Sequence, residues 1–318
     1  MKKVGILSLL LLLLAVLTAC NRTDYKGISK DEPFIASVNI GEPSIDFIRP
    51  NGEKIETWDL KEAYTGATLV GEHAILLYGN QLEQADLVNL DTGEIQKKID
   101  VSKGATNAYY DDANKTFYIA NSGLNEVTAY NQKGERIQTM KTGKYPMAML
   151  VEDGHLYVVN FKDTFISVFN TTTKKLEKKI PIPKSSHGLD FVDGELWLGG
   201  HGAGEKPNTH VLKINPKTSK VVGKMDLPIM PIAFAKLDER EFVLSHGESM
   251  LYELNEQQQI SWEQEIGSNP FAVEAFQNQI VVAGYDDQTL YWVKDHHIVK
   301  KTKVGQAPFQ LLVRENVK

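Results

Sequence analysis

Short apolar or alternating runs of residues, separated by turns, follow one another along most of the chain. Between residues 115 and 154, four such runs succeed each other at 117–120, 126–130, 136–141 and 147–151. Alternation with a period of two indicates β-strands, and strands this short cannot bury both faces of a sheet on their own. The unit is therefore expected to occur in several copies.

The chain contains further copies of this unit. Its first strand is expected at 35–39, 74–78, 117–121, 156–160, 196–200, 242–246 and 280–284. A spacing of roughly 38 to 46 residues lies in the range of propeller blades. Asn, Asp and Gly follow most of the second strands and provide the positive φ or local hydrogen bonds that tight hairpins need. Third strands often carry alternating Lys, which suits an exposed edge.

A Gly-x-x-Pro element, such as Gly143 to Pro146, introduces several of the fourth strands. Together with the aromatic-Val/Ile-x-Asn first strand, this pattern resembles the YVTN-type β-propeller repeat from residue 34 to about residue 316. The match is clear over 117–198 and in the final copy, and weaker in the first two copies, where no Pro precedes Ala67 or Ala108. The resemblance implies an all-β fold, a seven-bladed β-propeller with four-stranded blades.

The two ends of the repeat region indicate how the ring would close. The region begins with a first strand near Ile35 and finishes with a lone strand of the fourth type at 309–314. The N- and C-terminal strands are therefore expected to share one blade. A ring of six or eight blades and a β-sandwich are the competing interpretations. Such a repeat specifies a fold and says little about function.

Residues 1–19 are interpreted as a signal peptide, because Lys2 and Lys3 precede an apolar segment at 4–16 that is short for a membrane span. The next residues, Leu-Thr-Ala-Cys ending at Cys20, resemble a bacterial lipobox, and Cys20 is the only cysteine. The resemblance implies cleavage between Ala19 and Cys20 and lipidation of Cys20, with acyl chains such as palmitate. The alternatives are an ordinary signal peptide with a chance cysteine and an uncleaved signal anchor.

These features predict a protein that is exported and anchored by lipid to the outer face of the bacterial cell membrane. Residues 20–33 are polar and lack periodicity, so they are expected to hold the lipidated cysteine and a flexible tether. Residues 34–318 would then form the propeller domain. A second cysteine is absent from the sequence, which excludes an internal disulfide. The net charge of −6 argues against a nucleic-acid partner.

Candidate functional residues gather where the innermost strand of a blade begins and its neighbour ends, at the mouth of the central channel. His187 stands where sibling repeats carry Pro, and His201 ends the neighbouring strand of the same blade. His246 occupies the matching place in the next blade, and the long insertion at 202–210 lies beside these positions. The other candidate ligand-binding or catalytic residues are Asn121, Asn160 and Lys162.

Two classes of function fit this arrangement. We favour a binding module for a protein, a cell-wall polymer or a small molecule, with any protein partner on the mouth face. The alternative is a metal-assisted lyase or hydrolase, in which the histidines hold a divalent metal or act as general base. Histidines that only line the channel and hold water fit the pattern as well. The sequence requires no cofactor and has no Gly-rich phosphate loop, cysteine-based zinc spacing or Gly-x-Ser-x-Gly element.

Overall fold

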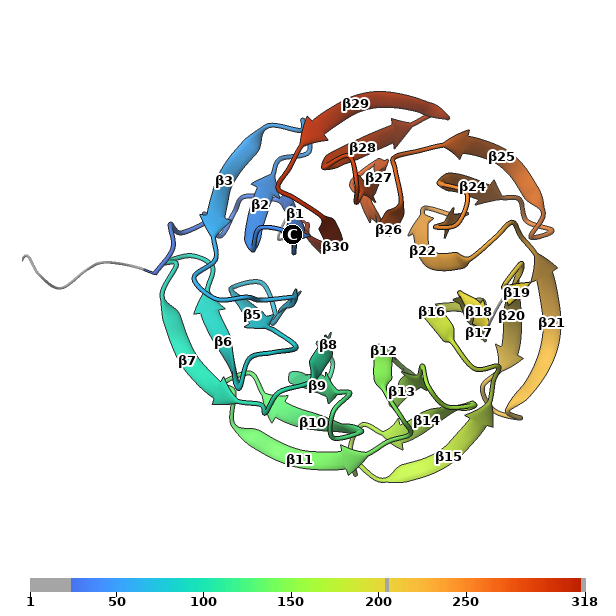
Figure 1. Ribbon diagram of the computed structural model, residues 1–318, viewed down its shortest axis with the longest axis horizontal. Helices are drawn as coiled ribbons and strands as arrows, with labels where there is room; N and C mark the ends of the chain where they lie inside the picture. Colours follow the sequence, from blue (N-terminus) through green and yellow to red (C-terminus); the bar gives the residue numbers. More distant parts are fainter. Residues whose placement is uncertain (1–23, 204–205, 316–318) are drawn as a thin grey trace, which may run out of the picture.

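The computed structural model describes residues 24–203 and 206–315, which form a ring of seven four-stranded antiparallel sheets (Figure 1). The predicted seven-bladed propeller is therefore confirmed. One further sheet, of two strands, is formed within the insertion of the fifth blade. None of the described residues belongs to a helix long and apolar enough to cross a membrane.

The first three blades are given from the channel outward. Blade 1 consists of β30 (Pro308–Arg314), β1 (Phe34–Asn39), β2 (Ser44–Ile48) and β3 (Lys54–Asp59). Blade 2 consists of β4 (Gly66–Leu69), β5 (Ala74–Tyr78), β6 (Gln84–Asn89) and β7 (Ile95–Asp100). Blade 3 consists of β8 (Ala105–Asp111), β9 (Thr116–Asn121), β10 (Glu126–Asn131) and β11 (Arg136–Lys141).

The remaining blades follow the same order. Blade 4 consists of β12 (Pro146–Glu152), β13 (His155–Asn160), β14 (Phe165–Asn170) and β15 (Leu176–Pro181). Blade 5 consists of β16 (Ser186–Val192), β17 (Glu195–Gly200), β20 (His210–Asn215) and β21 (Lys220–Asp226), with the hairpin β18 (Gly202–Ala203) and β19 (Lys206–Pro207) inserted. Blade 6 consists of β22 (Pro231–Leu237), β23 (Arg240–Ser245), β24 (Met250–Leu254) and β25 (Ile260–Glu265). Blade 7 consists of β26 (Pro270–Phe276), β27 (Gln279–Gly284), β28 (Thr289–Lys294) and β29 (His297–Lys303).

The first and last strands close the ring. β1 pairs antiparallel with β30, so that Phe34 lies opposite Arg314 and Ala36 lies opposite Leu312. The expected sharing of one blade by the two terminal strands is thereby confirmed. Closure gives the innermost strands of blades 1 and 7 a partner on each side and leaves no open end in the ring.

The apolar core is divided among the seams between blades. Seven clusters of buried residues each join two neighbouring blades. In β9, for example, Phe117 and Ile119 face blade 2, whereas Tyr118 and Ala120 face blade 4. The second strand of a blade, such as β9, is thus buried on both faces, which explains why its sequence is a continuous apolar run rather than an alternating one.

The expectation of a flexible tether is wrong for residues 24–33, which form an ordered strap against blades 1 and 2. Tyr25 is stacked on Trp58 with ring centroids 4.6 Å apart, and Ile28 is fully buried. The amide of Ile28 donates to the carbonyl of Leu90 at 2.7 Å, and the Trp58 indole donates to the carbonyl of Lys26 at 2.8 Å. The signal-peptide and lipidation predictions, including Ala19 and Cys20, lie outside the described residues.

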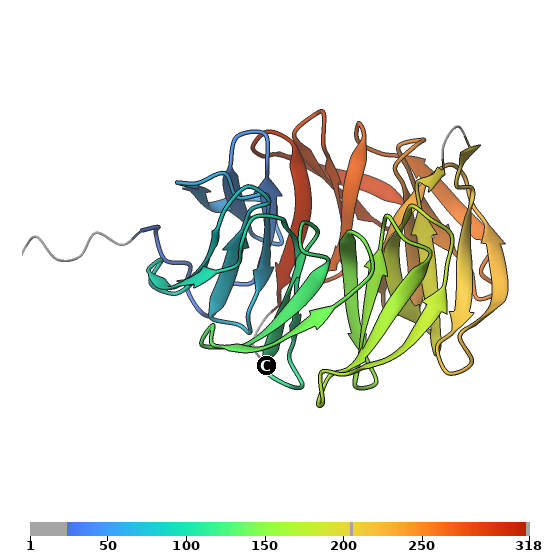
Figure 2. The ribbon, with the colours of Figure 1, turned by 60° about the horizontal axis from the view of Figure 1, so that its bottom comes forward.

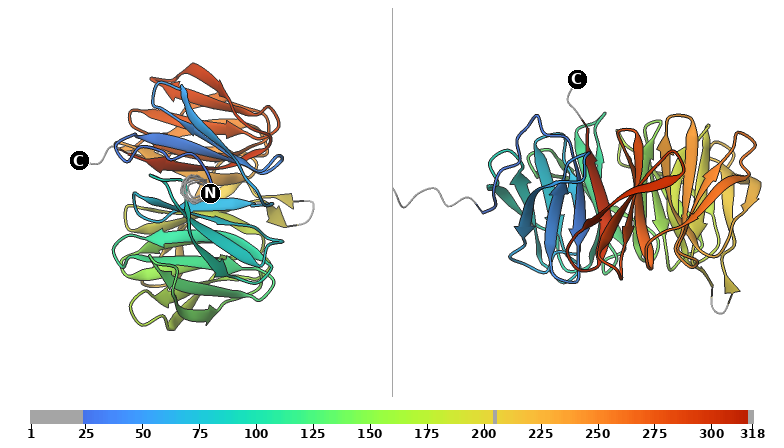
Figure 3. Two further views of the ribbon diagram at one scale, coloured as in Figure 1. Left: turned by 90° about the vertical axis from the view of Figure 1, so that its left-hand side faces the viewer. Right: turned by 90° about the horizontal axis from the view of Figure 1, so that it is seen from above.

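The innermost strands begin on one face of the disc, which we call the mouth face. The β18–β19 hairpin projects from the mouth face, and β30 ends on the opposite face (Figures 2 and 3). The strap enters at the outer rim, beside β3 and β7 (Figure 1). The mouth face therefore carries the candidate residues, while the N-terminal entry lies at the edge of the disc.

Candidate functional site

A β-bulge at the start of the innermost strand shapes the mouth. In six blades the pairing of this strand with its neighbour shifts by one residue just after the first pair, whereas β4 of blade 2 pairs without a shift. The extra residue at a bulge is re-aimed out of the regular ladder. The extra residues are Thr106, Met147, His187, Ile232, Phe271 and Phe309. All of these except Met147 line a central cavity of about 280 Å³.

A recurring turn holds the second ring of mouth residues, those that directly follow the neighbouring strand. The turn residue before the innermost strand has a positive φ, as at Ser185 (63°) and Met230 (59°). Its carbonyl accepts the amide hydrogen of the residue after the neighbouring strand: Ser185 accepts from His201 at 3.2 Å, and Met230 accepts from His246 at 3.0 Å. His201 and His246 are therefore placed equivalently in consecutive blades.

The structure brings the three histidines together. The ring centroids of His187 and His201 are 5.6 Å apart with nearly parallel planes, and those of His201 and His246 are 5.7 Å apart. The insertion of blade 5 braces this group, because the Asn208 amide donates to the carbonyl of His201 at 3.0 Å. The Asn208 carbonyl in turn accepts from the amide of Met230 at 2.7 Å. We call these three imidazoles the mouth histidines.

Half-buried aromatic rings extend the mouth histidines on both sides. On one side, Phe161 lies 6.2 Å from His201, and Tyr145 lies 6.1 Å from Phe161. On the other side, Phe271 lies 4.2 Å from His246 and 5.3 Å from Phe309, all measured between ring centroids. The aromatic arc consists of Tyr145, Phe161, Phe271, Tyr285 and Phe309. The arc residues come from blades 4, 7 and 1, and the mouth histidines of blades 5 and 6 lie between them, so five of the seven blades form a continuous ring-lined wall.

Burial controls the charge of the mouth histidines. Burial lowers the pKa of His187 to about 4, with smaller contributions from the neighbouring His201 and His246. Burial also lowers the pKa of His201, and it lowers that of His246 against the opposing effect of the Pro270 carbonyl. All three imidazoles are therefore neutral at pH 7. The Nδ1 atoms of His187 and His201 are buried and have no hydrogen-bond partner among the described residues.

Glu274 lies in the same central cavity and was missed by the sequence interpretation. Burial, with a smaller contribution from Asp190, raises the pKa of Glu274 to about 8. Its carboxyl group is consequently protonated at neutral pH and can donate a hydrogen bond. The available signal was an acidic residue within the otherwise apolar innermost strand β26.

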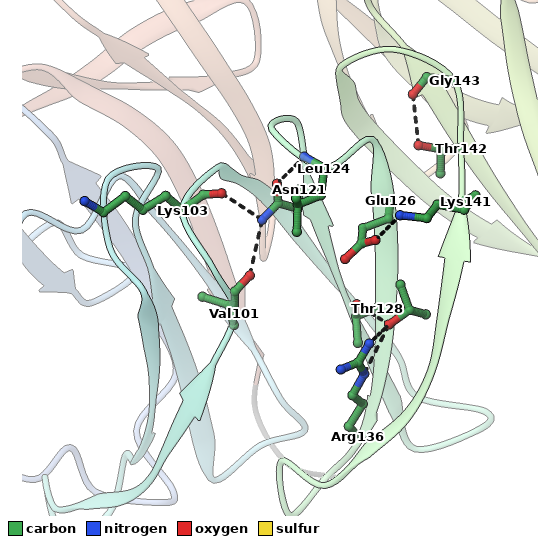
Figure 4. Close-up of polar contacts among 11 residues, drawn as sticks. Val101, Lys103, Asn121, Leu124, Glu126, Thr128, Arg136, Lys141, Thr142 and Gly143 are labelled. Atoms are coloured by element: carbon green, nitrogen blue, oxygen red, sulfur yellow. Dashed lines mark hydrogen bonds and ion pairs between the residues drawn. The ribbon is translucent and has the colours of Figure 1, made fainter.

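Asn121 and Asn160 lie at the mouth, and their side-chain amide groups are hydrogen-bonded to nearby backbone. The Asn121 side-chain amide donates to the carbonyls of Val101 and Lys103, and its oxygen accepts from the Leu124 amide at 2.9 Å (Figure 4). Asn160 is fully buried: its side-chain oxygen accepts from the Gly143 amide at 3.0 Å, and its nitrogen donates to the carbonyl of Phe165, the first residue of β14. Both residues stabilise loops, because their hydrogen-bonding groups are occupied.

Lys162 remains available at the edge of the site. It is exposed, and its ammonium group lies 4.3 Å from the centre of the Tyr145 ring in a cation–π contact. Among the described residues no group of three or more His, Cys, Asp or Glu side chains is arranged to hold a metal ion. In that same part of the chain no carboxylate is hydrogen-bonded to a mouth histidine, and His246 Nδ1 lies 3.3 Å from the carbonyl oxygen of Pro270.

Comparison with known proteins identifies the fold and no family. No protein-family model matches the chain, and no curated protein matches its sequence. A functionally unknown protein from Desulfotomaculum acetoxidans has a TM-score of 0.74 at 8% identity, with 89% of this chain and 99% of that one covered. Hydrazine synthase from Kuenenia stuttgartiensis has a TM-score of 0.71 at 12% identity, with 86% and 97% covered. Apo AztD from Citrobacter koseri has a TM-score of 0.60 at 12% identity, with 89% and 97% covered.

These identities are low, so the similarity extends to the β-propeller fold alone. That fold supports a binding or interaction module in general terms, because it presents loops of several blades around one opening.

Proposed function

We propose that this protein is an exported lipoprotein of the YVTN-repeat type, anchored to the outer face of the bacterial cell membrane through Cys20, and that its propeller mouth binds a ligand. The anchor rests on the lipobox-like sequence that ends at Cys20. The binding role rests on the mouth histidines and the aromatic arc. A ring whose backbone already holds these groups in place loses little conformational entropy on binding.

The observation that carries the binding role is the pair of unpartnered Nδ1 atoms on His187 and His201. Buried polar atoms in folded proteins nearly always have a hydrogen-bond partner, and exceptions need an explanation. Rotation of an imidazole about its Cβ–Cγ bond would turn its Nδ1 atom toward the cavity, where a bound ligand with hydroxyl or amide groups would provide the partner. The adjacent rings of Phe271 and Phe309 would pack against its apolar or ring-shaped part.

The neutral state of the mouth histidines narrows the chemistry of the ligand. A neutral imidazole offers one donor and one acceptor, and the protonated Glu274 at the cavity adds a donor. Uncharged polar groups therefore fit better than phosphates. A sugar unit of a cell-wall polymer, an uncharged small molecule and a neutral segment of a protein partner all satisfy this requirement, and the mouth face is where such a partner would contact the disc.

The test is a binding screen with matched histidine variants. Isothermal calorimetry with cell-wall fragments, sugars and neutral peptides is expected to identify a ligand whose affinity falls at least tenfold in His187→Ala and in His201→Ala. His297→Ala is the control, because His297 is exposed in the outer strand β29. Equal losses in the control, or a ligand indifferent to both mouth variants, would contradict the proposal.

The alternative is a metal-assisted lyase or hydrolase at the same histidines. One observation favours it: neutral imidazoles are the form that binds a metal or accepts a proton. We place binding first because the described residues offer no three-ligand group and no carboxylate that orients an imidazole. Metal analysis of the purified protein, with and without His187→Ala, separates the two. Stoichiometric Zn²⁺ or Mn²⁺ that disappears in the variant would favour the enzyme.

A further inference from the structure

The strap covers a part of the rim that is exposed in other blades. Each outer strand has one bulge residue near its start, and those of blades 3, 5 and 7 are Ile137, Val222 and Val299, which are 50%, 51% and 52% exposed. The equivalent residue of blade 1, Ile55, instead packs against the core cluster that contains Tyr25 and Ile28. The strap is thus an integral layer of the rim at the seam of blades 1 and 2.

The start of the strap is fixed as firmly as its middle. Asp24 forms an ion pair with Lys61 at 2.7 Å and accepts a hydrogen bond from the amide of Ile95, which begins β7. The next residue, Tyr25, donates its amide hydrogen to the carbonyl of Gly93 at 2.9 Å. A side chain on Gly93 would collide with the Tyr25 carbonyl, because its Cβ would lie 2.0 Å from that oxygen. The first described residues therefore have a defined place between the outermost strands of two blades.

The sequence places Cys20 four residues before Asp24. An extended chain advances at most about 3.6 Å per residue, so these four residues span at most ~14 Å. We propose that the strap holds the disc edge-on at the membrane, with the seam of blades 1 and 2 toward the lipid and both ends of the channel directed sideways. This inference rests on the lipidation that forms part of the proposed function.

The orientation has a consequence for access to the mouth. A ligand or partner would approach parallel to the membrane surface rather than from above it. Blade 5, with its inserted hairpin, lies across the ring from the seam of blades 1 and 2 and would be the part farthest from the lipid (Figure 1). A disc on a free tether would have no such preference among its blades.

The test uses the bulge residues of the outer strands as matched reporters. The full chain, acylated at Cys20, is reconstituted in phosphatidylethanolamine and phosphatidylglycerol vesicles that contain a headgroup-linked quencher. Because Cys20 is the only cysteine, each introduced cysteine is the only free thiol for a fluorophore. The variants are Gln96→Cys in blade 2, Ile137→Cys in blade 3, Val222→Cys in blade 5 and Val299→Cys in blade 7.

Quenching is expected to be strongest at position 96, intermediate at 137 and 299, and several-fold weaker at 222. A Gly/Ser insertion of about twenty residues between Cys20 and Asp24, with a mean span of ~25 Å, is expected to level this profile while the strap stays docked. Equal quenching at all four positions in the acylated protein without the insertion would overturn the edge-on arrangement. It would not contradict the proposed lipid anchor. An unmodified Cys20 in mass spectrometry overturns the proposed anchor and this inference together.

Discussion

At the scale of single residues, the site is set by polar groups placed where the surrounding β-structure denies them water. His187 does not stand at the position of the sibling prolines, which Ser186 occupies, but at the next residue, a bulge position that the sibling blades fill with Ile, Phe, Thr or Met. Its imidazole therefore lies in the central cavity beside apolar side chains such as Ile232 and Phe271. Protonating the imidazole there is unfavourable, and this makes the site sensitive to pH.

The lowered pKa of His187 predicts that the folded protein loses stability in acid. The pKa of His187 is lowered from 6.5 to about 4 in the folded protein, so between these values the unfolded chain binds more protons. Stability must then fall as the pH drops from 6.5 toward 4, by ~2 kcal/mol at pH 4.5. We expect His187→Gln to show a correspondingly smaller loss between pH 7 and 4.5 in urea unfolding. An identical pH dependence in the two proteins would show that His187 is not shielded from solvent.

The raised pKa of Glu274 predicts the opposite dependence of stability on pH. Its pKa is raised from 4.5 to about 8 in the folded protein, so the native state binds more protons than the unfolded chain between these values. The stability contributed by this group is complete below pH 4.5 and is lost as the pH rises through 8. We expect Glu274→Gln to lose less stability than the natural protein between pH 5 and 8.5, by on the order of 3 kcal/mol.

The Glu274 measurement has a matched control. Glu239 is exposed and lies at the turn between β22 and β23, so Glu239→Gln is expected to leave the pH profile unchanged. Thermal unfolding followed by circular dichroism across this range is sufficient. If Glu274→Gln and Glu239→Gln behave alike, the carboxyl group of Glu274 is ionised in the folded protein at neutral pH.

At the scale of elements, the strands were predictable and the strap was not. Expected first strands such as 74–78 and 156–160 match β5 and β13 within one residue, because each is an apolar run bounded by turn residues. Tyr25 and Ile28 are single apolar residues in a polar stretch and have no periodicity. The surface that receives them is formed by Trp58 and Ile95, which lie on two different blades. Such a contact between distant segments leaves no local pattern.

The candidate site, like the fold, could be predicted from the sequence only in part. The mouth histidines could be placed from the repeat, since equivalent positions of consecutive blades lie side by side. Asn121 and Asn160 end β9 and β13 one residue before the positions equivalent to His201 and His246, and their amide groups donate to backbone carbonyls whose places the sequence pattern does not define. The role of Glu274 depends on burial, which follows from the complete ring rather than from strand β26.

The buried side chain of Ile28 allows a test of whether residues 24–33 form an ordered layer or a flexible tether. Ile28 is fully buried, so Ile28→Ala is expected to lower the free energy of unfolding by about 2–4 kcal/mol through lost burial and a cavity. Lys30→Ala, two residues away and exposed, is expected to have little effect. Urea unfolding of both variants measures the difference. Equal stabilities would mean that residues 24–33 do not pack against the blades in solution.

At the scale of the whole molecule, one arginine joins all the parts that close the ring. The guanidinium of Arg314, at the end of β30, donates to the carbonyl of Ser29 in the strap at 2.6 Å. It also donates to the carbonyl of Glu72 before β5 at 3.0 Å, and it lies 4.5 Å from the centre of the Phe34 ring. The strap, blade 1 and blade 2 are therefore held by a single buried side chain.

Arg314→Ala is expected to destabilise the protein by roughly 3 kcal/mol, because the hydrogen bonds from a buried charged donor to several carbonyls are lost. Arg314→Lys should recover only part of this loss, since an ammonium group cannot reproduce the planar fork that reaches several carbonyls and stacks on Phe34. Arg136→Ala is the control, because Arg136 is exposed at the start of β11. Hydrogen exchange should locate the loss at β1, β30 and the strap first. Exchange that increases equally in all blades would show instead that the ring opens as one cooperative unit, with no weak point at its closure.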